Sequence, residues 1–131
     1  MGRYLVVANQ TLGGDQLMGE VRRRAAAGPS SFYVIVPRGV AAEDEHRATL
    51  IAQSRLNQAL TQLRSEGLEV QGDIGDPEPL TAIEDALAGQ RFDEIIISTL
   101  PSGISHWLRM DLPQRAERKF KLPVTTITTR H

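Results

Sequence analysis

Three uninterrupted apolar runs constrain the fold of this chain more than any other feature. They cover residues 4–8 (YLVVA), 32–36 (FYVIV) and 94–98 (EIIIS). Because successive side chains of a strand point to opposite faces, each run would place apolar groups on both sides of a sheet. Such runs are typical of central strands in a parallel sheet that helices cover on both faces.

Two weaker strands and four helices complete the predicted pattern. The strands cover residues 68–73 (LEVQGD) and 124–129 (VTTITT). Two helices cover 15–27 and 44–66, a third lies within 75–89 (GDPEPLTAIEDALAG), and a fourth begins near Asp111. Asp76 is the predicted N-cap of the third helix, with Pro77 as its first residue. Asp111 is the predicted N-cap of the fourth, in a D-x-x-Q capping box with Gln114.

This alternation of strands and helices predicts a single α/β domain over residues 1–131, with a doubly wound parallel sheet and helices on both faces. The pattern alone allows two strand orders, 2-1-3-4-5 and 3-2-1-4-5. In either order, a ligand would lie beyond the carboxyl ends of the strands at the switch point. The loops expected there begin at Asn9, Pro37 and Ser98.

Composition argues against several classes of partner. The chain has a formal net charge of -1, so it lacks the overall positive field of a nucleic-acid or acidic-membrane binder. It contains no cysteine, and no segment approaches the roughly 20 apolar residues that span a bilayer. We therefore expect a cytoplasmic protein with no membrane partner. Its three scattered histidines predict no metal site, and no dinucleotide, Walker A or G-x-S-x-G motif occurs.

Most of the chain resembles the universal stress protein (UspA-like) family. The stretch 67–87 (GLEVQGDIGDPEPLTAIEDAL) resembles its third strand, turn and third helix. The stretch 92–127 (FDEIIISTLPSGISHWLRMDLPQRAERKFKLPVTTI) resembles its fourth strand, ligand loop, fourth helix and last strand. The resemblance implies a five-stranded parallel sheet ordered 3-2-1-4-5, and pairing of two subunits through the C-terminal strand.

The ATP-binding motif of that family is degenerate in this chain. Members that bind ATP carry Gly-x-x-Gly, nine residues, and then Gly-Ser or Gly-Thr. The two single glycines correspond here to Ser98 and Pro101, and the final pair to Asp111 and Leu112. An acidic residue that is frequent at the end of the first strand corresponds to Asn9. The candidate pocket implied by the resemblance therefore contains Asn9, Val36, Ser98, Thr99, Pro101, Ser102, Gly103 and Asp111.

These replacements predict poor binding of a nucleotide's phosphates. Glycines let backbone N–H groups approach a phosphate, and a helix N-terminus adds partial positive charge. Pro101 has no N–H to donate. As an N-cap, Asp111 would occupy the free amides of the fourth helix and bring a negative charge to the same place.

The polar residues of the 98–115 loop allow two interpretations. Arg109 could pair with a nearby carboxylate such as that of Asp111, leaving His106 solvated. Alternatively, these cations and hydroxyl groups could form a re-shaped pocket for another anion or a small polar ligand. Trp107 is expected to pack as a lid or against the last helix, with stacking on a base as the alternative.

We interpret the chain as a non-catalytic, stress-associated or regulatory binding module with no cofactor and an unassigned ligand. The alternative is a universal stress protein that binds ATP, AMP or a cyclic nucleotide through a variant loop. A third hypothesis, an enzyme of the wider adenine-nucleotide α/β group, lacks a paired acid and base in the sequence. The β-branched segment 124–129 would leave an open sheet edge, so we expect a homodimer formed through this strand.

Overall fold

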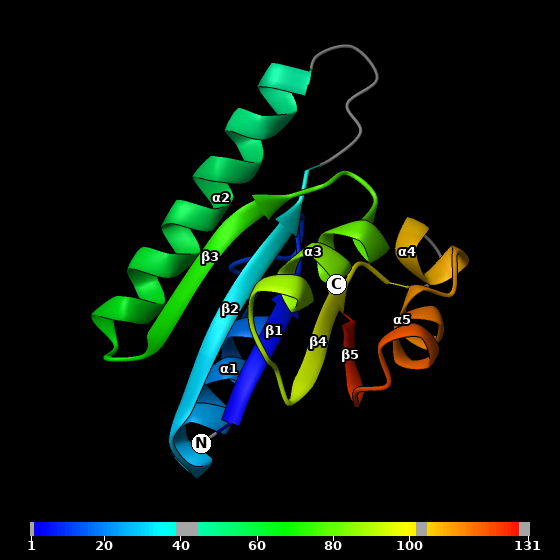
Figure 1. Ribbon diagram of the computed structural model, residues 1–131. Coiled ribbons are helices and arrows are strands. Elements are labelled where there is room, and N and C mark those ends of the chain that lie inside the picture. The colour runs from blue at the N-terminus through cyan, green and yellow to red at the C-terminus, as the bar shows by residue number, and fades with distance from the viewer. Residues whose placement is uncertain (1, 39–44, 102–104, 129–131) are drawn as a thin grey trace.

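The computed structural model describes residues 2–38, 45–101 and 105–128. Its sheet has five parallel strands in the order β3-β2-β1-β4-β5, which Figure 1 shows edge to edge. The strands are β1 (Gly2–Val7), β2 (Ser30–Pro37), β3 (Glu69–Gly75), β4 (Glu94–Thr99) and β5 (Val124–Thr128). The predicted fold class is confirmed, and of the two strand orders the structure has 3-2-1-4-5.

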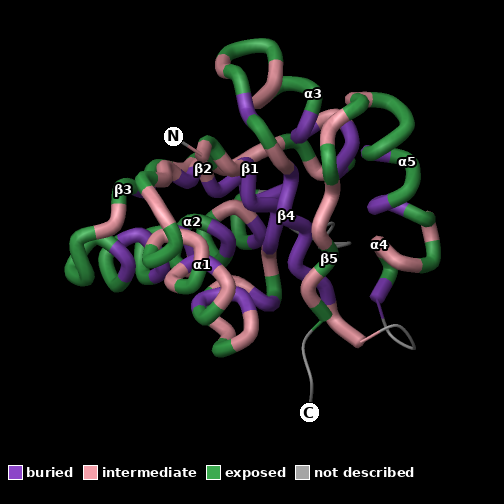
Figure 2. Tube along the Cα trace, turned by 90° about the horizontal axis from the view of Figure 1, so that it is seen from below, coloured by how far each residue is buried: buried purple, intermediate pink, exposed green. Residues whose placement is uncertain are grey.

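Helices cover both faces of this sheet. They are α1 (Asp15–Ala27), α2 (Glu45–Ser65), α3 (Pro79–Gly89), α4 (His106–Arg109) and α5 (Leu112–Phe120). The side chains of α1 and α2 pack with Val6, Val34 and Ile96 on one face. Those of α3 and α5 pack with Leu5, Ile35 and Ile97 on the other. Neighbouring residues of one strand thus enter different cores, as the apolar runs predicted, and Figure 2 shows β1, β2 and β4 buried between the helices.

The long helix α2 matches its prediction closely. All of its predicted inward residues are buried, namely Ala48, Ala52, Leu56, Ala59, Leu60 and Leu63. The helix is followed by Gly67, whose φ of 83° lies in the left-handed region that favours glycine. The backbone N–H of Gly67 donates to the carbonyl of Arg64 at 3.0 Å. In the described part of the chain, no helix is long and apolar enough to cross a membrane.

The predicted cap of α3 was wrong. The N-cap is Glu78 rather than Asp76, and Pro79 rather than Pro77 is the first helical residue. The Glu78 carboxylate accepts from the backbone N–H of Leu80 at 2.9 Å. Asp76 instead accepts from the N–H of Glu78 at 2.9 Å, which makes a turn just before the helix.

The predicted capping box at α5 was also wrong. Asp111 precedes the helix, but its backbone is left-handed (φ 55°, ψ 38°) and its side chain makes no capping hydrogen bond. An N-cap side chain reaches the helix amides from an extended backbone, which this residue does not have. Asp111 is instead the link between α4 and α5, since its N–H donates to Leu108 and its carbonyl accepts from Arg115.

A partly buried ionic cluster fastens α1 to the amino-terminal end of the sheet. Arg24 donates to Glu20 on its own helix and to Glu94 on β4, both at 2.6 Å. Its guanidinium also lies 5.1 Å from the centre of the Tyr4 ring. Thr125 on β5 donates to the second carboxylate oxygen of Glu94. One arginine therefore connects α1, β4 and the edge strand.

This cluster predicts a pH-dependent stability difference for Glu20→Gln. Burial raises the pKa of the Glu20 carboxyl, but hydrogen bonds and charges from Arg24 and Arg23 outweigh it, so the net pKa is lowered. A lowered pKa in the folded state stabilises the protein above the unfolded pKa, and this stabilisation is lost as pH falls through the folded value. Urea unfolding should therefore show the variant less stable at pH 7, with the difference shrinking toward pH 3. An equal difference at both pH values would contradict the role given to this carboxylate.

Candidate functional site

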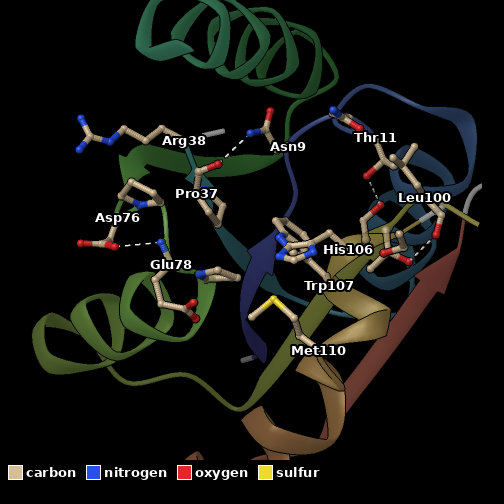
Figure 3. A pocket seen from close by; sticks show the side chains of 16 residues that line it. Asn9, Thr11, Pro37, Arg38, Asp76, Glu78, Leu100, His106, Trp107 and Met110 are labelled. Atoms are coloured by element: carbon tan, nitrogen blue, oxygen red, sulfur yellow. Dashed lines mark hydrogen bonds between the residues drawn. The ribbon is translucent and has the colours of Figure 1, made fainter. Parts of the chain in front are cut away.

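A cavity lies at the carboxyl ends of β1, β2, β3 and β4. Its volume is about 730 Å³, within the range of small-molecule sites. Strand order reverses between β1 and β4, so the cavity lies at the topological switch point of the sheet. It is lined by Asn9, Gln10, Thr11, Pro37, Arg38, Asp76, Pro77, Glu78, Pro79, Ser98, Thr99, Leu100, Ser105, His106, Trp107 and Met110 (Figure 3).

The structure brings together only some of the predicted pocket residues. Asn9, Ser98 and Thr99 line the cavity. The lining does not include Val36, Pro101 and Asp111. The side chain of Val36 is buried in the core beside α1 and α2, and Asp111 is exposed at the start of α5. Ser102 and Gly103 lie outside the described residues.

A pair of hydroxyl groups forms part of the cavity floor. Thr11 follows β1 and Ser98 lies near the end of β4, and these two strands are hydrogen-bonded neighbours. The two side-chain oxygens are 2.6 Å apart, and either could be the donor. Thr11 is 5% exposed and Ser98 is 1% exposed, so the pair is shielded from bulk water.

Asn9 lies beside this pair with its amide held in one orientation. Its Nδ2 donates to the carbonyl of Pro37 at 2.8 Å, a contact drawn in Figure 3. Its Oδ1 accepts from the Arg55 guanidinium of α2 at 2.6 Å. Because a carbonyl only accepts and a guanidinium only donates, the amide cannot flip without losing both bonds. One Nδ2 hydrogen and one Oδ1 lone pair remain for a ligand.

Two other walls of the cavity carry helix starts that are already capped. At α3 the Glu78 carboxylate accepts a hydrogen bond from the backbone N–H of Leu80, and Pro77 and Pro79 have no N–H. At α4 the Ser105 hydroxyl accepts from the amide of Leu108 at 3.2 Å. Trp107 lies on the α4 wall and packs against the core beneath α3 and α5.

Replacing Glu78 by alanine should lower the free energy of unfolding by about 1 kcal/mol, the usual cost of losing an N-cap. Urea unfolding of the wild type and the variant measures this loss. Glu84→Ala is the matched control on the same helix, because Glu84 forms an exposed ion pair with Lys119 that contributes little. Equal losses in both variants would contradict a capping role for Glu78.

Several lining residues were missed by sequence reasoning. The loop after β3, which supplies Asp76 to Pro79, was not included among the expected ligand loops, although it too begins at the carboxyl end of a strand. Thr11 carried no motif that would single it out, and neither did Arg55, which contacts the lining residue Asn9 from α2. Within the described ranges, no group of three histidine, aspartate or glutamate side chains is placed to hold a metal ion.

These features define a doubly wound α/β domain with a ligand-sized cavity at its switch point. No protein-family model matches the sequence, and no curated protein matches it either. Solved structures do match. A universal stress protein from Archaeoglobus fulgidus is 21% identical with a TM-score of 0.67, and the match covers 97% of this chain and 93% of that one. A universal stress protein family protein from Arabidopsis thaliana, solved with AMP bound, is 11% identical with a TM-score of 0.70, over 99% and 93% of the two chains. The chain therefore has the fold of the universal stress proteins.

Proposed function

We propose that this protein is a non-catalytic binding module that binds a small polar ligand in the cavity at the switch point and does not bind a triphosphate. The observation that carries the proposal is the cavity itself. It has the volume of a small-molecule site, a polar floor made by the buried Thr11 and Ser98 and the partly buried Asn9, and an indole on its wall. An apolar cavity with a few fixed polar groups is the usual form of a ligand site.

The charges and amides around the cavity argue against a bound triphosphate. The charged lining residues include two carboxylates, those of Asp76 and Glu78, and one arginine, Arg38. The amides of Leu80 and Leu108, which a phosphate would need, are already bonded to side chains of this chain. Capping of these helices by the chain's own side chains therefore supports the exclusion of a triphosphate. The capping residues are Glu78 and Ser105 rather than Asp111.

A binding role is also supported by the partner of the buried serine. A serine nucleophile needs an adjacent general base. The Ser98 hydroxyl instead pairs with that of Thr11, which is not a base at neutral pH.

The second candidate function is binding of a nucleotide such as AMP or a cyclic nucleotide. It is favoured by the AMP bound in the Arabidopsis protein, whose fold this chain shares. Asn9, Ser98 and Thr99 would then contact the nucleotide, together with the backbone of Val36 and residues 102 and 103.

Thermal denaturation with adenosine, AMP, cyclic AMP and ATP with magnesium separates the two candidates. A ligand at a hundred times its dissociation constant stabilises the folded protein by about 2.7 kcal/mol, which raises Tm measurably. A shift with AMP or a cyclic nucleotide would establish the second candidate. A large shift that requires the triphosphate would contradict the first.

We further propose that the edge of β5 pairs with a second copy of the chain. In the described residues β5 pairs only with β4, and its β-branched residues Val124, Thr125 and Ile127 remain partly exposed. Natural proteins usually cover such edges. Light scattering at micromolar concentration should give the mass of a dimer, and a monomer mass would contradict the pairing.

A further inference from the structure

The hydroxyl pair of Thr11 and Ser98 has one more hydrogen than it can use internally. Each hydroxyl group carries one hydrogen. The bond between the two oxygens, 2.6 Å apart, consumes one of them. The accepting hydroxyl keeps its own hydrogen, and in the described part of the chain neither oxygen has a second hydrogen-bond partner.

Leaving that remaining hydrogen without an acceptor would destabilise the folded protein. Both residues are more than nine-tenths buried, and a buried donor without a partner is destabilising. Both residues also line the cavity, which is the direction in which a partner can lie. A hydroxyl that accepts one hydrogen bond also becomes a better donor, since bonds in a chain polarise one another.

The neighbouring hydroxyl on the floor behaves differently. Thr99 donates its hydrogen to the carbonyl of Leu100 at 3.0 Å, a contact visible in Figure 3. Its donor is therefore satisfied by the loop itself. This contrast separates a hydroxyl that stabilises the loop from a pair that still has a donor to offer.

We propose that the Thr11–Ser98 pair is a specificity-determining element that donates its spare hydrogen to an acceptor atom of the ligand. The inference rests on the proposed binding function and adds the chemistry of the ligand. The ligand presents a carbonyl oxygen, a ring nitrogen or another acceptor to the floor beside Asn9. A ligand that presents only donors there, such as an ammonium group, leaves the spare hydrogen without an acceptor and binds more weakly.

The first test needs no ligand. A high-resolution crystal structure of the unliganded protein should show an ordered water on the cavity side, within about 3.2 Å of Thr11 Oγ1 or Ser98 Oγ. The water should be absent in the variant Thr11→Val/Ser98→Ala, which removes both hydroxyls. A protein acceptor for the spare hydrogen, or no third polar atom near either oxygen, would overturn the proposal.

The second test measures binding, with AMP as the probe. The variant Thr11→Val/Ser98→Ala should bind AMP about tenfold more weakly, the effect of one lost hydrogen bond. The variant Thr11→Ser keeps the hydroxyl and should stay within about twofold of the wild type. Ser30→Ala is the control, because it removes a hydroxyl that donates to backbone carbonyls at the opposite end of the sheet. Equal affinity in the wild type and the double variant would overturn the proposal.

The two tests distinguish failure of the proposal about the Thr11–Ser98 pair from failure of the proposed binding function. If AMP does not bind the wild type, the nucleotide alternative fails, and the position of the water alone decides whether the pair presents a donor.

Discussion

Replacing Gly72 by alanine should lower the free energy of unfolding by about 2–3 kcal/mol. Gly72 lies in β3, opposite Val34 of β2 and beneath α2. A Cβ atom at this position would lie 2.6 Å from the carbonyl oxygen of Val34 and 2.8 Å from Cδ1 of Leu56. The Leu56 side chain can rotate, but the Val34 carbonyl is fixed in the sheet, so β3 has to shift away from β2.

Gly19→Ala is the matched control for this substitution. Gly19 lies in α1, and a Cβ there would meet no atom within 4 Å. Because alanine favours the helix and restricts the unfolded chain, this variant should be more stable by about 0.5–1 kcal/mol. Urea unfolding of both variants should thus give changes of opposite sign. A Gly72→Ala variant as stable as the wild type would contradict the close approach of the Val34 carbonyl and Leu56 to this position.

Replacing Arg24 by methionine should lower the free energy of unfolding by a similar amount, about 2–3 kcal/mol. The arginine is 15% exposed and lies between two carboxylates that are each 18% exposed. Its loss leaves Glu94 without this cation and leaves Glu20 with only the exposed Arg23. Methionine keeps much of the apolar contact with Tyr4, so the loss measures mainly the charge.

Two further variants make the Arg24 prediction specific. Arg23→Met removes the neighbouring arginine, whose side chain is 70% exposed although it also pairs with Glu20, and should change stability by less than about 0.5 kcal/mol. Adding Glu94→Gln to Arg24→Met should recover part of the loss, because it removes the charge that lost its arginine on β4. Equal effects of the Arg23 and Arg24 substitutions would contradict the role of the cluster.

Local sequence patterns predicted most of the fold. The apolar runs located the central strands, and the spacing of alanine and leucine residues located the buried face of α2. Both signals are local, since each depends on the period of one element. The strand order is a non-local property, and the pattern alone left two orders open.

The two capping predictions were wrong where a local sequence pattern is compatible with two structures. The sequence Asp-Pro-Glu-Pro contains two acids and two prolines. The pattern alone does not indicate that Glu78, rather than Asp76, accepts from a helix amide. Asp111 and Gln114 fit a capping box in sequence. The chain has to turn from α4 into α5 at Asp111, however, and the left-handed backbone that makes this turn prevents capping.

The site was predictable in location but not in detail. The rule for parallel sheets placed it at the loops after Asn9, Pro37 and Ser98, and these loops do line the cavity. The Thr11–Ser98 pair requires β1 and β4 to be neighbours, which they would not be in the order 2-1-3-4-5. Arg55 contacts Asn9 across 46 residues of sequence, through the packing of α2.

The central claim is that this cavity does not bind a triphosphate. Isothermal titration of the purified protein with ATP and magnesium tests it most directly. With Asp76 and Glu78 among the lining residues and the amides of Leu80 and Leu108 already bonded to side chains, we expect no binding tighter than millimolar. A low-micromolar dissociation constant for ATP, lost when the triphosphate is shortened to AMP, would contradict the claim.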